Sequence, residues 1–559
     1  MASTSALRTA EIHSLRRSSL RYGHDRTALL TTAGNRPIRS TKALREWHDL
    51  LLFVLAHPQD AAEHAWGLHQ LERATALAKR MIAQSESHLE ALANSGLEGS
   101  ALYGPYTFTL VRWMLHRWPG QVQLYLMDAP LEELREILRT LVLPVEQETL
   151  DQPFDDVDEL LAAVLGTTPS QQLTNLIALL EQRQVDDRHR ELLFARMQVH
   201  VRIAEDTPGL SLSHARGPVG RHFFHTDGIQ RGVDLMATVN TRLGKEIKLT
   251  AQGEEELINT ARTVLAAMHR EIDPTTYAGA AELFDMGRGL RIALFHLDAA
   301  HRLPFDSYVG FMAFKNGVPL AYGGAWIFPG RSKVGINVFP SQRGGESALF
   351  FAQLLRLYRQ RFGVDRFEAE NYQLGHNNPD GLRSGAYWFY YRLGFRPSRA
   401  AHQRKAASEF AKLNARKDYP VPLATLRELV EAGLELVVNE RAGPLVDTAA
   451  LTVAVQQHIL QVYRGDRAKA LTQATSRLDR VLAFKKPRRW TQEEHVSMAC
   501  WALPLDMISD LEQWSVRDRQ NLIEAIRSKS APTGTQHQNV LKKHLRLRQG
   551  WQAIAGVQE

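Results

Sequence analysis

Apolar residues recur at helical intervals over most of this chain. In residues 41–197 they fall three and four positions apart, as in Trp47, Leu50 and Val54, and this period predicts amphipathic helices that bury one face. The same period returns after Pro420 and continues to the end of the sequence. We therefore expect two mostly helical regions, one on each side of the centre of the chain.

Between residues 305 and 400 the period changes to that of β-strands. Asn316-Gly317 is a strong hairpin signal, because both residues tolerate the positive φ angles of a tight two-residue turn. The strands expected around this turn form an antiparallel meander. They cover residues 308–315, 318–328 and 333–339.

A turn with two adjacent glycines, residues 342–347, follows the meander and opens an amphipathic helix. After this helix the sequence predicts a strand and a shorter helix, and then a Leu-Gly-Phe motif at 393–395. The three elements after the turn cover residues 348–362, 366–372 and 384–392. The expected fold class is therefore α+β, with a mixed sheet module flanked by mostly helical N- and C-terminal regions.

The length of 559 residues exceeds that of one compact domain, because domains usually have roughly 100–200 residues. Shifts of composition and of period mark the expected boundaries. The predicted units are a disordered basic leader, 1–40, a helical domain, 41–200, a mixed lead-in, 201–304, the sheet module, 305–400, and a helical C-terminal domain, 401–559.

Most of the formal net charge of +7 lies in the leader. Residues 1–46 hold nine Lys or Arg and three Asp or Glu, so the rest of the chain is nearly neutral. Such a segment has little apolar surface to bury, and we expect it to be disordered and dispensable for folding. Its Arg- and Ser-rich composition leaves two alternatives, a mitochondrial transit peptide and an arm that binds nucleic acid or another acidic partner.

The single cysteine, Cys500, excludes an intramolecular disulfide and a multi-cysteine metal site. No run of apolar residues reaches the ~18 that a membrane helix needs. The leader also lacks the apolar stretch of a secretory signal. The sequence therefore predicts a cytoplasmic protein with no membrane partner.

The end of the sheet module carries its most specific motif. Ala386 is followed four residues later by Tyr390 and then by Leu-Gly-Phe at 393–395, after a glycine turn that opens a helix. This order and spacing resemble the closing elements of the GNAT (Gcn5-related N-acetyltransferase) superfamily. The resemblance covers residues 305–400 only, and it implies a GNAT-like fold for them.

The resemblance implies an acyltransferase that moves an acyl group from acetyl-CoA, or another acyl-CoA, to an amine acceptor. In the family the glycine turn grips the pyrophosphate of coenzyme A, and the strand before it splays from the next strand to admit the thioester arm. A helix N-terminus suits this role, because its unpaired N–H groups and its dipole favour anions. The cofactor-binding residues that the resemblance implies are Val338, Phe339, Gln342, Arg343, Gly344, Gly345, Ser347 and Arg383, with no metal.

Tyr390 matches the family's general acid, which protonates the departing thiolate. Glu368 and Glu370 lie two residues apart on one expected strand, and hence on one face of it. They are the candidates for the base that takes a proton from the attacking amine. A solvated strand face is the alternative explanation for these two carboxylates.

Two features depart from the family pattern. The turn fits Arg/Gln-x-x-Gly-x-Gly/Ala only with Ser347 in the last place, and the register set by Pro340 puts Glu346 where the central glycine belongs. A carboxylate beside a pyrophosphate repels it. Arg383 stands where the family often has asparagine. Two alternatives to an acyl-CoA-dependent enzyme therefore stay open. One is a transferase with a carrier-protein or aminoacyl-tRNA donor, and the other is a non-catalytic GNAT-like interaction module.

The other polar motifs give weaker predictions of function. His222 and His225 have an H-x-x-H spacing, but no third metal ligand lies nearby in the sequence, and buried, hydrogen-bonded histidines are the simpler interpretation. The Gly-Arg-Gly motif at 287–289 predicts a turn. The loop 376–380 would lie beside the acceptor entrance of a GNAT-like fold.

Overall fold

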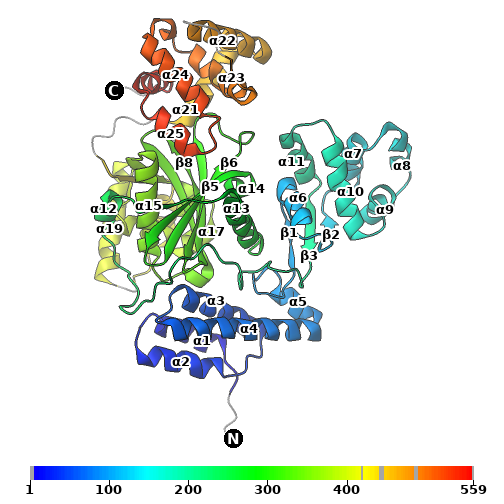
Figure 1. Cartoon of the computed structure of the whole chain (residues 1–559), viewed down its shortest axis with the longest axis vertical. Coiled ribbons are helices and arrows are strands. Elements are labelled where there is room, and N and C mark those ends of the chain that lie inside the picture. Colours follow the sequence, from blue (N-terminus) through cyan, green and yellow to red (C-terminus); the bar gives the residue numbers. More distant parts are fainter. Residues whose placement is uncertain (1–4, 417–418, 440–445, 484–488, 557–559) are drawn as a thin grey trace.

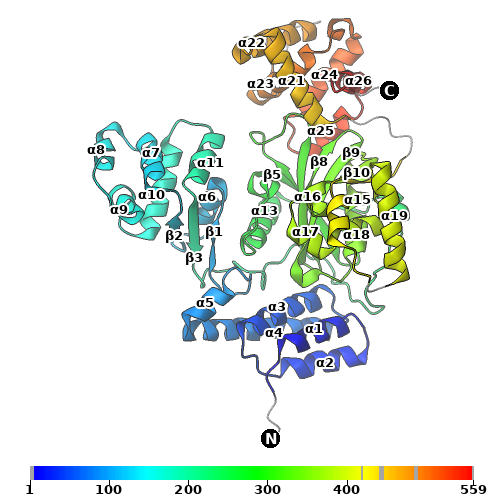
Figure 2. The same ribbon diagram turned by 180° about the vertical axis from the view of Figure 1, so that it is seen from behind.

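The computed structural model describes residues 5–416, 419–439, 446–483 and 489–556. It has the α+β architecture expected from the sequence, with a large mixed sheet at its centre (Figure 1). Helices from the two ends of the chain lie at opposite ends of this sheet. A smaller unit projects from one side, as Figure 2 also shows from behind.

Residues 5–92 form a helical unit that packs on the sheet. Its first two helices occupy the segment for which the sequence predicts a disordered leader, so that prediction is wrong for the described residues 5–40. Ile12 and Leu30 are buried in an apolar cluster that the unit shares with the sheet. The helices are α1 (Thr9–Ser18), α2 (His24–Gly34), α3 (Thr41–Ala56), α4 (Ala61–Gln84) and α5 (Glu86–Leu92).

The basic leader folds because its arginines find partners inside the protein. The buried guanidinium of Arg26 donates to a carboxylate oxygen of Glu63 at 2.8 Å and to two backbone carbonyls, one of them that of His57. Arg36 forms an ion pair with Glu11 at 3.0 Å. The positive charge of this segment therefore does not indicate disorder, because some of its arginines form tertiary contacts.

Residues 102–203 form a small α/β unit with its own apolar core. The sequence predicts a helical domain up to residue 200, yet three strands assemble antiparallel in the order β1-β3-β2. The strands are β1 (Leu102–Pro105), β2 (Val122–Met127) and β3 (Val199–Ile203). The helices are α6 (Phe108–Arg117), α7 (Leu131–Leu141), α8 (Gln147–Leu150), α9 (Val157–Leu165), α10 (Pro169–Gln182) and α11 (Asp187–Arg196).

The central sheet has nine strands in the described part of the chain. They are β4 (Glu246–Ile247), β5 (Ala278–Gly287), β6 (Leu290–Leu297), β7 (Ser307–Lys315), β8 (Val318–Phe328), β9 (Arg331–Val338), β10 (Arg366–Ala369), β11 (Arg396–Pro397) and β12 (Leu434–Val437). Their order is β11-β12-β10-β9-β8-β7-β6-β5-β4, and only β9 and β10 run parallel. The predicted sheet module covers residues 305–400, and the sheet extends beyond it in both directions along the sequence.

The predicted meander is present as β7, β8 and β9. Asn316 and Gly317 form the turn between the first two strands with φ angles of +47° and +80°, which confirms the hairpin. The side-chain amide of Asn316 also donates to the backbone carbonyls of Ala56 and Phe223 at 3.0 and 2.9 Å. The hairpin turn therefore attaches the sheet to the N-terminal helices.

Helices cover both faces of the sheet. On one face α15 (Ser347–Phe362) and α18 (Ala386–Arg392) pack over strand residues such as Val309 and Phe311. On the other face α3 and α13 (Ala251–Ala266) pack over the alternate residues, such as Met312 and Phe314. The remaining helices around the sheet are α12 (Leu235–Asn240), α14 (Asp273–Thr276), α16 (Asn371–Leu374), α17 (Pro379–Ser384), α19 (Ala400–Ala415) and α20 (Leu423–Leu429).

The described residues from 446 to 556 are helical, whereas β12, inside the region 401–559 for which the sequence predicts a helical domain, belongs to the central sheet. Thr491 and Glu494 form a capping box at the start of α23. Trp551 packs on Phe328 of β8 and so joins this unit to the sheet. The helices are α21 (Thr448–Val462), α22 (Arg467–Leu482), α23 (Gln492–Asp506), α24 (Val516–Ser528), α25 (Gly534–Leu541) and α26 (Leu545–Ile554). Among all described residues, no helix is both long and apolar enough to cross a bilayer.

Candidate functional site

The parallel strands β9 and β10 pair in the interior of the sheet and then diverge. Their register covers only three positions, from Arg366 opposite Arg331 to Glu368 opposite Lys333. Beyond this last pair β9 continues to Val338, whereas β10 ends one residue later. Helix α15 forms the crossover between them. The end of β9 therefore makes no backbone pairing with β10. This free end lies next to the start of α15.

A glycine turn, residues 342–347, connects the end of β9 to α15. Gly344 has a φ of +78°, a conformation that strains residues with a side chain. The first turn of α15 has no side-chain cap, and among the described residues the backbone N–H groups of Ser347, Ala348 and Leu349 have no hydrogen-bond partner. Together with the positive end of the helix dipole, these N–H groups favour an anion.

Glu346 of the glycine turn is directed into the protein interior. The residue is only 3% exposed. Its carboxylate accepts hydrogen bonds from Nζ of Lys315 at 2.5 Å, from the guanidinium of Arg288 at 3.3 Å and from the backbone N–H of Gln230 at 3.0 Å. Burial alone would raise the pKa of Glu346, but the contacts with His225, Lys315 and this N–H lower it well below its usual range. The carboxylate is thus ionised, and two cations neutralise it.

Two buried histidines lie beside this carboxylate. His57 follows the end of α3 and His225 precedes α12, and one ring nitrogen of each lies within 4.8 Å of the other and of a Glu346 oxygen. Nδ1 of His57 is 3.2 Å from the carbonyl oxygen of Phe53. Nε2 of His57 and both ring nitrogens of His225 have no hydrogen-bond partner among the described residues. Burial lowers the pKa of both histidines, so both rings are neutral. We call these three residues the His–Glu cluster.

Separate sequence patterns pointed to His225, to Glu346 and to the motif 287–289, which contains Arg288. None of these patterns includes Lys315 or His57, which contact them. Lys315 carried a signal, since it is the one charged residue in an apolar strand, and it is 2% exposed. His57 gave no signal, because it simply ends an apolar helix before a proline. Contacts between distant segments create this cluster.

Helix α3 covers one side of the glycine turn. A Cβ atom placed on Gly345 would lie 3.1 Å from Phe53 and 3.4 Å from His57. The guanidinium of Arg16 donates to the carbonyl oxygen of Arg343 at 3.0 Å. Within the turn only Arg343 and Gly344 are exposed, so the start of α15 is accessible to solvent from their side.

Seven of the predicted cofactor-binding residues lie together between positions 338 and 347, and they differ in exposure. The exposed ones are Arg343 and Gly344, the half-buried ones are Val338, Gly345 and Ser347, and the buried ones are Phe339 and Gln342. The eighth residue, Arg383, lies on α17, which also includes part of the loop predicted at 376–380. It is exposed and forms an ion pair with Asp380 at 2.5 Å.

Tyr390 lies in the apolar core. It is 1% exposed, and its ring packs edge-on against those of Phe351 and Phe395, with centroids 5.4 and 5.3 Å away. Its hydroxyl makes no well-aligned hydrogen bond with the described residues. Burial raises the pKa of Tyr390, and the nearby side chain of Gln373 offsets this only in part. The hydroxyl is therefore protonated and shielded from water.

Gln373 of α16 lies in the gap between the diverging strands. Its side-chain amide donates to the carbonyl oxygen of Ile336 in β9 at 2.8 Å. Its Oε1 lies 3.0 Å from the position of a Cβ placed on Gly335. Gln373 thus forms a hydrogen bond with the edge of β9 that β10 leaves unpaired. No motif in the sequence indicated this residue.

The two candidate base residues do not share a strand, so that expectation is wrong. β10 ends at Ala369, and Glu370 takes the N-cap position of α16. Glu368 is half-buried, and burial raises its pKa. The half-exposed side chain of Glu370 forms an ion pair with Lys333 at 3.1 Å. Their role as a base stays a prediction.

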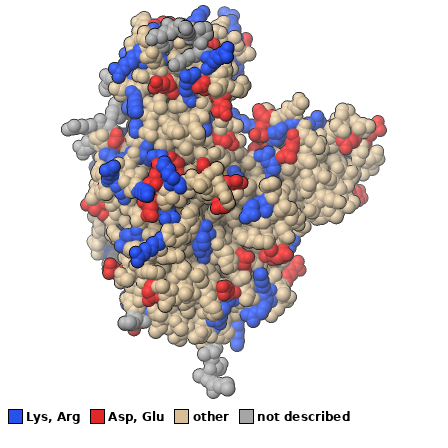
Figure 3. Space-filling view, in the orientation of Figure 1, with Lys and Arg blue, Asp and Glu red and all other residues tan. Residues whose placement is uncertain are grey.

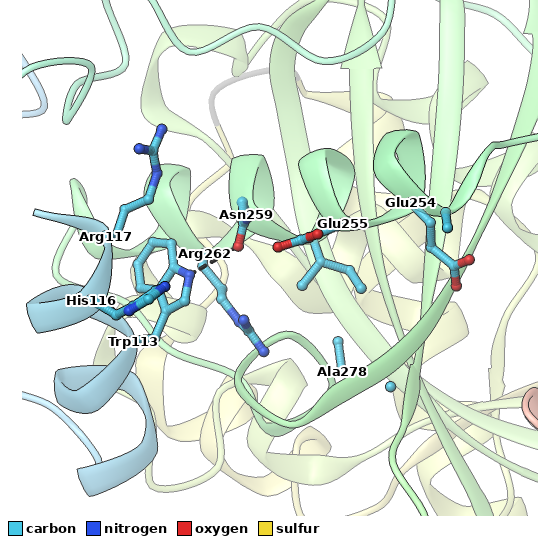
Figure 4. A pocket seen from close by; sticks show the side chains of 11 residues that line it. Trp113, His116, Arg117, Glu254, Glu255, Asn259, Arg262 and Ala278 are labelled. Atoms are coloured by element: carbon cyan, nitrogen blue, oxygen red, sulfur yellow. Dashed lines mark hydrogen bonds between the residues drawn. The ribbon is translucent and has the colours of Figure 1, made fainter.

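A separate cavity of about 600 Å³ lies between α6 of the small α/β unit and α13 (Figure 4). Trp113 of α6 donates from its indole nitrogen to Asn259 of α13 at 2.9 Å across its wall. The lining combines cations, such as Arg117 and Arg262, with the carboxylates of Glu254 and Glu255. It includes no residue of the glycine turn.

Surface charge is mixed on the face shown in Figure 3. Basic and acidic side chains alternate over the sheet module and over the C-terminal helices. A nucleic-acid partner usually requires a continuous basic surface. This face of the described chain shows none.

Comparison of the chain with protein-family models, with curated proteins and with solved structures found no match.

Proposed function

We propose that this protein is an acyltransferase that moves an acyl group from an acyl-CoA donor to an amine. One observation carries the proposal: a parallel strand pair diverges where the connecting helix begins with three free N–H groups. The residue that argued most against a phosphate ligand, Glu346, is neutralised by Lys315 and Arg288 inside the protein. The start of α15 is thereby available to an anion.

In this proposal the diphosphate of the donor binds the N–H groups of Ser347 and Ala348. Arg343 adds a cation from the exposed part of the turn. The arm that carries the thioester enters between β9 and β10 and takes the place of Gln373 at the carbonyl of Ile336. Displacement of Gln373 would also remove the side chain that lies beside the Tyr390 hydroxyl.

The proposed chemistry needs an acid and a base on opposite sides of the thioester. As the amine nitrogen attacks the carbonyl carbon, the C–N bond forms and the C–S bond breaks. Glu368 takes the proton from the amine, and Tyr390 gives a proton to the departing thiolate. Burial raises the pKa of Glu368, and a higher pKa makes a carboxylate a stronger base.

Ser347→Asp tests the proposal, with Ser347→Asn as the matched control. The new carboxylate lies at a helix N-terminus, where it stabilises the helix but repels a diphosphate. By isothermal titration calorimetry we expect CoA to bind Ser347→Asp about 10- to 100-fold more weakly than wild type, with no loss of melting temperature. The uncharged Ser347→Asn should keep the wild-type affinity.

Two results would contradict this reasoning. If wild type binds neither CoA nor acetyl-CoA, the acyl-CoA donor is excluded. If the Asp and Asn variants bind CoA equally well, the donor lies elsewhere on the protein.

A second candidate function is that of a non-catalytic module that connects the helical units. The observation that favours it is the burial of Tyr390, whose hydroxyl is shielded from any ligand while Gln373 holds the strand gap. This function predicts no CoA binding and no effect of either Ser347 variant. The same titration therefore separates the two candidates.

A further inference from the structure

We propose that the His–Glu cluster is a binding site for one divalent transition-metal ion of the Zn²⁺ class. His57, His225 and Glu346 come from three segments far apart in the sequence, and their ligand atoms all lie within 4.8 Å of one another. Two imidazoles and one carboxylate are a donor set that zinc commonly uses in proteins. The proposal does not depend on the identity of the acyl donor.

The distances suit a bound ion. Nε2 of His225 lies 3.6 Å from Oε2 of Glu346, which is too long for a good hydrogen bond. Tetrahedral zinc with bonds of ~2.0–2.1 Å holds its ligand atoms roughly 3.3 Å apart. Small side-chain shifts would therefore bring these two atoms onto one ion.

The unpaired nitrogens are the second, independent argument. His57 and His225 are 0% and 1% exposed, and three of their four ring nitrogens have no partner among the described residues. Buried polar atoms are rarely left unpaired, and an ion or a water is the usual explanation where they are. A proton on Nδ1 of His57, donated to the carbonyl of Phe53, leaves the Nε2 lone pair free. A metal-binding histidine is commonly held in this way.

The competing cations are the main argument against the site. Lys315 and Arg288 contact the same carboxylate, and their charge repels a metal ion. However, Lys315 uses Oε2 while Arg288 uses Oε1, and each carboxylate oxygen has two lone pairs. Oε2 can therefore bind Lys315 and an ion together. Removing the charge of Lys315 should then tighten metal binding.

Three protein ligands leave a fourth position of a tetrahedral ion to a water molecule, as is usual for zinc with three protein ligands. The ion would cross-link α3 to the glycine turn and to the segment before α12. Since this arrangement exists only in the folded chain, the ion should raise the melting temperature.

The full chain, freed of any histidine tag and stripped with a chelator, is titrated with Zn²⁺ and with Co²⁺. We expect one metal ion per chain by elemental analysis, a rise in melting temperature, and the visible absorption of four-coordinate Co²⁺. His225→Ala should lose all three signals. His222→Ala, in the same H-x-x-H motif but outside the cluster, should keep them.

Lys315→Met keeps the test decisive if His225→Ala fails to fold. Without the competing ammonium, we expect about tenfold tighter Zn²⁺ binding and a larger thermal shift than in wild type. Failure of both wild type and Lys315→Met to bind stoichiometric metal would overturn the proposal. Wild-type affinity in a folded His225→Ala variant would overturn it as well.

Discussion

Tyr387 and Tyr390 lie three residues apart on α18 and allow a matched test of the proposed general acid. Both are 1% exposed, and neither hydroxyl has a well-aligned hydrogen bond to the described residues. Substitution of either residue by phenylalanine removes one oxygen and leaves the ring in its packing position. In the proposed mechanism only Tyr390 gives a proton to the thiolate.

We expect Tyr390→Phe to affect the free energy of unfolding and kcat differently. A buried, unpaired hydroxyl costs ~1–3 kcal/mol, so its removal should leave the free energy of unfolding unchanged or raise it by about 1 kcal/mol. Loss of a general acid should lower kcat by about 10²–10⁴-fold with little change in donor affinity. This fold-change equals ~3–5 kcal/mol of activation free energy. Tyr387→Phe should share the effect on stability and keep wild-type kcat.

The assay is thiol release under saturating acyl-CoA and amine, with differential scanning calorimetry on the same samples. If Tyr390→Phe and Tyr387→Phe have equal kcat values near that of wild type, Tyr390 is not the acid. If kcat falls equally in both, the loss reflects the packing of α18 and not proton transfer.

Two further predictions concern stability. Deletion of residues 1–40 should lower the melting temperature in differential scanning fluorimetry, because it removes buried apolar residues and leaves Glu63 buried without its ion-pair partner; an unchanged value would show that the leader does not support the fold. Burial alone would raise the pKa of Glu282, but its contacts with His296, Arg361 and Thr535 lower it from 4.5 to about 2. The ionised carboxylate therefore contributes up to about 3 kcal/mol above pH 4.5, which is lost as the pH falls towards 2. Glu282→Gln should flatten the dependence of melting temperature on pH in this window, and an unaltered slope would contradict the assignment.

Local patterns were sufficient for most elements of the sheet module, although the strand expected at 366–372 ends at Ala369. The strand expected at 333–339 is β9 at 331–338, and the helix expected at 348–362 is α15 at 347–362. The Asn316-Gly317 turn was equally clear. These features depend on residue periodicity and on the φ preferences of single residues, which neighbours in the chain set.

Contacts between distant residues decided the rest. The leader folds because Arg26 meets Glu63, and β12 enters the sheet because β10 offers it a free edge. Glu346 was predicted to repel a phosphate, but Lys315, 31 residues away, neutralises it. The metal site could not be predicted for the same reason, since His57 reaches His225 only after α3 has packed on the sheet. The environment of a charge or an imidazole depends on the residues that bury it, and these come from other parts of the chain.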